Sequence, residues 1–128
     1  MDRILQLLGI AHKAGLLAIG GDAADAAARN GKARLIISAS DASPGAHRRA
    51  GYIAETCRAA HVITPYTKDE LGSITGRGSP GTLAILDTGL AAGFMKGLAG
   101  TAPEKYEETA KQLEGKADAL AKKRRTAL

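Results

Sequence analysis

Residues 20–41 read GGDAADAAARNGKARLIISASD, which predicts a short helix followed by a buried strand. We expect Asp22 to cap the helix, because its carboxylate can accept hydrogen bonds from the first amides, and Gly31 to end it in a left-handed conformation. The apolar run at 35–37 is typical of a strand covered on both faces. A helix start beside a strand end exposes unpaired N–H groups and partial positive charge, so this place favours an anion, above all phosphate.

Composition bounds the class of protein. The chain has 128 residues, of which 45% are hydrophobic and 3% aromatic, which fits one domain with a core of Leu, Ile, Val and Ala. Cys57 is the single cysteine, and the sequence has neither a signal-peptide pattern nor a long apolar run, so we expect a cytoplasmic protein without a membrane segment. The 18 basic and 13 acidic side chains give a net charge of +5, which is compatible with a polyanionic partner.

Helical and strand patterns alternate along the chain. Ser43 before Pro44 predicts a helix start, and Thr67 with Glu70 forms a capping box. We expect helices over residues 2–15, 20–31, 43–60, 67–76 and 87–98, and strands over residues 16–19, 35–39, 62–64 and 82–86. Such alternation predicts an α/β fold, a three-layer α/β/α sandwich with a mixed four-stranded central sheet.

The composition changes near residue 100, so we expect an α/β/α domain over residues 1–100 and a charged helical tail over residues 101–128. Apolar residues recur in the tail at spacings of four and three, at Tyr106, Ala110, Leu113, Ala117 and Leu120. This stripe leaves three alternatives: a helix docked or partly frayed on the domain, a dimer seam, or an RNA-touching arm led by the basic residues 122–125. The oligomeric state is left open.

Several short motifs occur together in a characteristic order, namely LLGIA at 7–11, GGD at 20–22, NGKARLII at 30–37, ASDAS at 39–43 and YTKDELG at 66–72. As a set, over residues 3–98, they resemble the small bacterial members of the ribosomal-protein superfamily L-seven-Ae/L-thirty-e. The resemblance implies an α/β/α sandwich that binds RNA, often a kink-turn, through the start of the helix after the first strand and through neighbouring loops.

The resemblance also implies which residues face RNA. In RNA-binding members the helix start carries an Asn or Lys, often a Glu, and a Lys one turn later. The corresponding positions here are Asp22, Ala23 and Ala26, and none matches. Gly20, Gly21 and the loop at 77–79 do match the superfamily. Nearby cations can supply positive charge beside them. The candidate RNA-binding residues are Lys13, Gly20, Gly21, Asp22, Lys32, Arg34, Arg77, Gly78 and Ser79.

The preferred interpretation is a non-enzymatic RNA-binding protein associated with the ribosome or another structured RNA, as part of a ribonucleoprotein. The alternative is a protein-interaction module that has lost the RNA-contacting side chains. We expect no cofactor, metal, membrane or small-molecule substrate. Cys57 and His61 alone are too few for a zinc site, and the glycine pattern at 76–81 follows a helix and precedes a strand, the reverse of a dinucleotide-binding motif. Capping accounts for Asp41 and Asp87 without catalysis.

Overall fold

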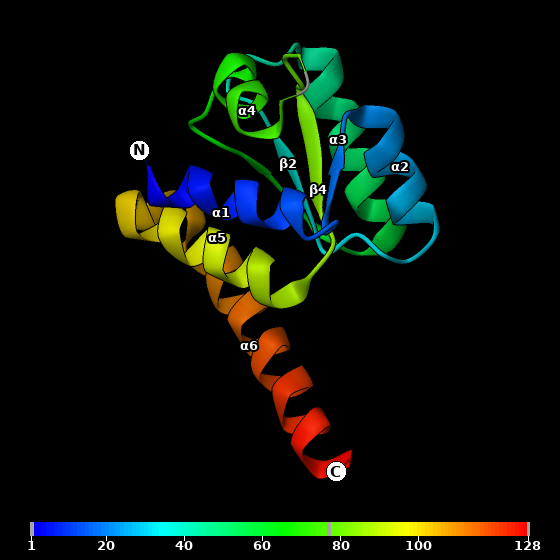
Figure 1. The fold of residues 1–128 in the computed structure, drawn as a ribbon, viewed down its shortest axis with the longest axis vertical. Helices are drawn as coiled ribbons and strands as arrows, with labels where there is room; N and C mark the ends of the chain where they lie inside the picture. Colours follow the sequence, from blue (N-terminus) through cyan, green and yellow to red (C-terminus); the bar gives the residue numbers. More distant parts are fainter. Residues whose placement is uncertain (1, 77, 128) are drawn as a thin grey trace.

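The computed structural model describes residues 2–76 and 78–127 and contains ten regular elements (Figure 1). The helices are α1 (Arg3–Lys13), α2 (Gly21–Arg29), α3 (Pro44–Cys57), α4 (Lys68–Thr75), α5 (Thr88–Thr101) and α6 (Pro103–Ala127). The strands are β1 (Leu17–Ile19), β2 (Leu35–Ser38), β3 (Ala60–Ile63) and β4 (Thr82–Ile85).

The four strands form one mixed sheet in the order β1-β4-β2-β3. Strand β4 is antiparallel to both of its neighbours, with Ala84 opposite Ala18 of β1 and Ile36 of β2. Strand β3 runs parallel to β2, with Val62 opposite Ile37. The predicted α/β class with a mixed four-stranded sheet is confirmed.

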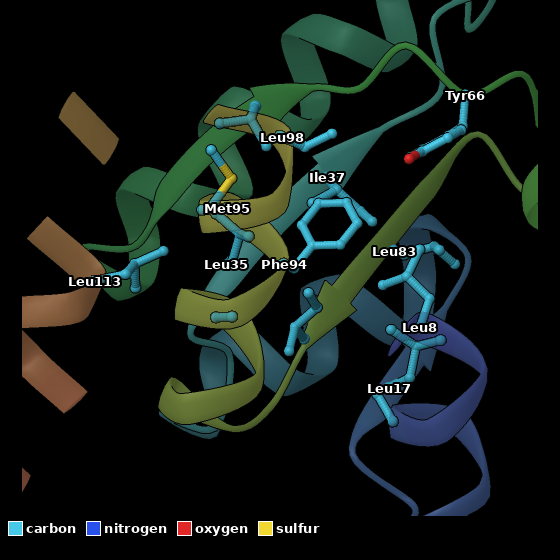
Figure 2. Packing of buried hydrophobic residues seen from close by; sticks show 14 of the residues in the cluster. Leu8, Leu17, Leu35, Ile37, Tyr66, Leu83, Phe94, Met95, Leu98 and Leu113 are labelled. Carbon is cyan, nitrogen blue, oxygen red and sulfur yellow. The ribbon is translucent and has the colours of Figure 1, made fainter. Parts of the chain in front are cut away.

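Alternate side chains of β2 point into two separate hydrophobic cores. Ile36 packs with the alanines of α2 and with α3, whereas Leu35 and Ile37 pack with α1, α4 and α5. Figure 2 shows the second core, in which Phe94 and Met95 of α5 lie beside Leu35 and Ile37. All four residues of β2 are buried, as expected for a strand covered on both faces. The three-layer sandwich is therefore confirmed.

Most of the predicted helix starts are confirmed by capping geometry. The Asp2 carboxylate accepts a hydrogen bond from the amide of Ile4 at 2.7 Å. Ser43 caps α3, with Pro44 in its first turn, and Thr67 with Glu70 forms the expected capping box of α4. These side chains satisfy amides that have no partner inside their helices, so the elements begin where the local sequence indicates.

Two local predictions are wrong. Asp22 does not cap α2, because the chain turns at Gly20, which has φ 98° and ψ 160° and is itself the N-cap residue, so that Asp22 lies inside the first turn. Helix α3 ends at Cys57 instead of residue 60, because Arg58 adopts a left-handed conformation with φ 55° and Ala60 already pairs with β2. In both places the sheet fixes where the chain must turn.

The tail forms one helix, α6, whose first half is docked and whose second half leaves the body of the molecule (Figure 1). Tyr106, Ala110 and Leu113 are buried, and the Tyr106 hydroxyl donates a hydrogen bond to the carbonyl of Ile63 at 2.8 Å. Leu120, by contrast, is 40% exposed. Of the three alternatives for the tail, the structure thus has a docked helix with a projecting end. No helix in the described part of the chain has both the length and the apolarity needed to cross a bilayer.

Candidate nucleic-acid interface

One end of the sheet gathers the starts of α2, α3 and α4, and we call it the helix-start end (Figure 1). Backbone hydrogen bonds hold its loops together. The Gly20 amide donates to the carbonyl of Thr82 at 2.9 Å, and the Ser40 amide donates to the carbonyl of Tyr66 at 2.8 Å. Helix N-termini carry partial positive charge, so three of them at one end favour an anionic ligand there.

The start of α2 differs from the starts of α1, α3, α4 and α5. Side chains cap α1, α3, α4 and α5. At α2 the N-cap is Gly20, and within the described residues no side chain makes the capping hydrogen bond. The conformation of Gly20, with φ 98° and ψ 160°, is essentially restricted to glycine. The first amides of α2 are therefore available to an external acceptor.

A guanidinium group lies directly against this start. A Cβ atom built on Gly21 would lie 2.8 Å from Nη1 of Arg49, so the guanidinium lies against the bare backbone of Gly21. Nη2 of Arg49 is 2.8 Å from Oδ1 of Asp22, and this hydrogen bond raises the pKa of Arg49. Arg49 comes from α3 and is absent from the residues predicted from the sequence. The signal that could have identified it is the Arg48-Arg49 pair in a helix whose predicted start lies at this end.

The second predicted loop packs against α4. The carbonyl of Gly78 lies so close to Gly72 that any side chain at Gly72 would clash with it. The hydroxyl of Ser79 donates a hydrogen bond to Oδ1 of Asp69 at 2.7 Å. Gly78 and Ser79 are thus held against α4 and are exposed, just before the start of strand β4. Arg77 lies outside the described residues.

Carboxylates at the helix-start end are engaged by neighbouring donors. Asp41 accepts a hydrogen bond from the amide of Lys68 at 2.8 Å. Asp2 accepts one from the hydroxyl of Tyr66 at 2.9 Å, and burial, followed by this hydrogen bond, raises the pKa of Tyr66. The hydroxyl therefore stays neutral at physiological pH. These carboxylates serve to join loops and helices at this end.

The predicted cations Lys13, Lys32 and Arg34 lie at the opposite end of the sheet. The amide of Arg34 donates to the carbonyl of Ile85 at 2.8 Å, which places it at the far end of β4 from Gly20. Lys32 precedes Arg34 in the same loop, and Lys13 ends α1 just before β1 begins. The candidate residues therefore fall into two groups: Gly20, Gly21, Asp22, Gly78 and Ser79 at the helix-start end, and Lys13, Lys32 and Arg34 at the other.

The remaining reactive side chains are dispersed. Nε2 of His61 lies 2.7 Å from Oγ of Ser38, and burial, with a smaller contribution from His47, lowers the pKa of His61. Cys57 and His61 line two different clefts, and Cys57 donates to carbonyls of its own helix. Among the residues that the structure describes, no group of three or more His, Cys, Asp or Glu side chains is placed to hold a metal ion.

The fold is shared with proteins of known structure. A Bacillus halodurans protein of unknown function superposes with a TM-score of 0.69 at 21% identity, covering 77% of this chain and 98% of the other. A Giardia lamblia 15.5 kD RNA-binding protein superposes with a TM-score of 0.59 at 19% identity, covering 75% of this chain and 84% of the other. No family model and no curated protein matches the sequence. At these identities the comparisons establish the class of fold, a three-layer α/β/α sandwich.

Proposed function

We propose that the protein binds structured RNA at the helix-start end and acts without catalysis. The observation that carries the proposal is the Arg49 guanidinium lying on Gly21 beside the uncapped start of α2. The fold likeness to the Giardia lamblia RNA-binding protein adds support. A binding role also fits the separation of Asp41, Cys57 and His61, because one is held by a backbone amide and the other two line different clefts.

The contacts in this proposal are mainly to the RNA backbone. The first amides of α2 and the cation of Arg49 bind phosphate oxygens, since charge-assisted hydrogen bonds to phosphate are the strongest that this end can offer. RNA-binding members of the superfamily that the sequence resembles carry a lysine at the position of Ala26. In this protein Arg49 supplies the positive charge instead. Gly78 and Ser79 are exposed and offer a second contact. The target that suits such a shape-reading surface is a bent RNA, for which a ribosomal kink-turn is our specific hypothesis.

The direct test compares Arg49→Gln with Arg29→Gln. Both arginines are exposed and each pairs with an aspartate, but Arg29 lies at the far end of α2. Fluorescence anisotropy at low salt should show that Arg49→Gln weakens binding to a kink-turn RNA roughly 5- to 30-fold, the loss of about 1–2 kcal/mol from one charged hydrogen bond. Arg29→Gln should bind like wild type. Equal affinities of the two variants would overturn the site, and equal binding of an unkinked RNA would overturn the kink-turn hypothesis.

A protein-interaction module is the second candidate, and the position of Asp22 favours it. The Asp22 side chain is 97% exposed and its carboxylate opposes the charge of Arg49. Replacing Asp22 with Asn discriminates the two functions. If the protein binds RNA, Asp22→Asn should tighten binding several-fold, because a carboxylate that repels phosphate is removed and Arg49 is released. If the end serves a protein partner, neither form should bind the RNA.

A further inference from the structure

A small cleft at the end of the sheet opposite α2's start is lined by three cations. It has a volume of about 160 Å³, and we call it the three-cation cleft. Its charged lining residues are Arg34, which precedes β2, Arg58, which follows α3, and Lys116 of α6. The other lining residues are uncharged: Ala33, Cys57, Ala59, Thr88 and Leu113. The fold therefore brings three positive charges from distant parts of the sequence to one concave place.

In the described part of the chain, the three cations of this cleft are not paired with carboxylates, since none of them lies within salt-bridge distance of one. Nη1 of Arg34 donates to the carbonyl of Gly31 at 2.9 Å, which orients the guanidinium and leaves its charge intact. Like charges that converge raise the energy of the free protein, and a bound anion relieves that repulsion.

The surroundings add to the positive potential. Helix α5 begins at Thr88. This residue lines both the three-cation cleft and an adjoining cleft of about 430 Å³. The adjoining cleft shares Arg34 and adds Arg124 from the projecting half of α6. Its acidic lining residue is Asp87, whose carboxylate accepts the amide of Leu90 at 2.9 Å and so caps α5. Cations thus outnumber acids in the lining of these two clefts.

We propose that the three-cation cleft is a phosphate-binding site, distinct from the helix-start end. Its volume is well below the roughly 300 Å³ at which sites for whole small molecules begin, so it fits a single phosphate group. Such a group can belong to the backbone of the RNA, in which case this inference rests on the proposed function, or to a free phosphate compound. The recognition chemistry, three cationic donors around one phosphate, is the same for both.

The first experiment titrates the isotope-labelled full chain with inorganic phosphate and follows its backbone amides by NMR. We expect saturable shifts at Arg58, Ala59 and Thr88. The variant Arg58→Gly should lose most of this response while folding at least as stably, because glycine adopts the left-handed conformation of position 58 without strain. Lys116→Gln should also lose it, and Lys111→Gln, an exposed lysine on the same helix, should retain it. Shifts that do not saturate, or that persist in Arg58→Gly and Lys116→Gln, would overturn the site.

A second arm identifies the source of the phosphate. If RNA supplies it, the Arg58→Gly variant should bind a long structured RNA several-fold more weakly, and its log–log salt slope should be shallower by about 0.7–0.9. An unchanged RNA affinity together with lost phosphate shifts would assign the site to free phosphate compounds. If the wild type gives saturable phosphate shifts but binds no RNA, the proposed function fails and the phosphate site stands.

Discussion

At the scale of single residues, Gly20 determines how β1 passes into α2. Its φ of 98° and ψ of 160° lie where a side chain is strongly disfavoured, although a Cβ there would meet no atom of the described residues within 4 Å. We expect Gly20→Ala to lower the free energy of unfolding by about 1–3 kcal/mol, purely through backbone strain. Gly9 lies within α1 and also has open space, so Gly9→Ala should instead stabilise by up to about 1 kcal/mol. Urea unfolding of both variants checks the prediction, and equal effects would contradict it.

A second residue-scale prediction concerns His61 and pH. Because burial lowers the pKa of His61 from its ordinary value of 6.5, the unfolded chain binds this proton more readily than the folded one. Stability from the neutral ring is therefore present above about pH 6.5 and is lost as pH falls toward the lower, folded pKa. The substitution His61→Gln keeps a polar group near Ser38 but removes the titration. Its unfolding free energy should fall less steeply than that of wild type between about pH 7 and pH 5, and parallel curves would contradict the assignment.

At the scale of elements, α6 divides into a packed half and a projecting half. Leu113 is 3% exposed and belongs to the main core, whereas Leu120 is 40% exposed. Leu113→Ala should cost about 2–5 kcal/mol because it opens a cavity, and Leu120→Ala should cost less than about 0.5 kcal/mol. Thermal or urea unfolding of the two variants makes the comparison. Similar losses would mean that the projecting half is also packed in solution.

The helix boundaries show which features of the fold are determined by the local sequence. Asp2, Ser43 and Thr67 accept hydrogen bonds from amides two or three residues further on, so their capping roles could be predicted. The position of Asp22 inside the first turn of α2 could not be predicted, because the register of β1 against β4 determines that the chain turns at Gly20. Likewise α3 ends at Cys57, followed by the left-handed Arg58, because β3 must begin in register with β2. Local signals fix helix starts well, and pairing between distant segments fixes the remaining boundaries.

At the scale of the whole molecule, strand direction separates the two groups of candidate residues. Strands β1 and β2 run in the same direction, since β4 lies between them and is antiparallel to both. Gly20 follows β1 and Arg34 precedes β2, so the two residues must lie at opposite ends of the sheet. The sequence predicts the strands but not their order, and for this reason it could not show which cations share a face. Arg49 was missed for the same reason.

This separation leads to a prediction about RNA length. The path from Arg34 along β2 to Ser40 spans six residues, or about 20 Å at ~3.3 Å per residue, and we expect a short kinked RNA bound at the helix-start end to leave the three-cation cleft free. With a short RNA, Arg49→Gln should weaken binding and Arg58→Gly should not. With an RNA extended by a further stem, both substitutions should weaken binding. The double variant should then lose the sum of the two free energies within about 0.5 kcal/mol, because the two sites lie at opposite ends of the sheet. Anisotropy titrations with both RNAs give all the values. If Arg58→Gly weakened the short RNA as much as the long one, the two sites would not be separate, since one compact ligand would then reach both ends of the sheet.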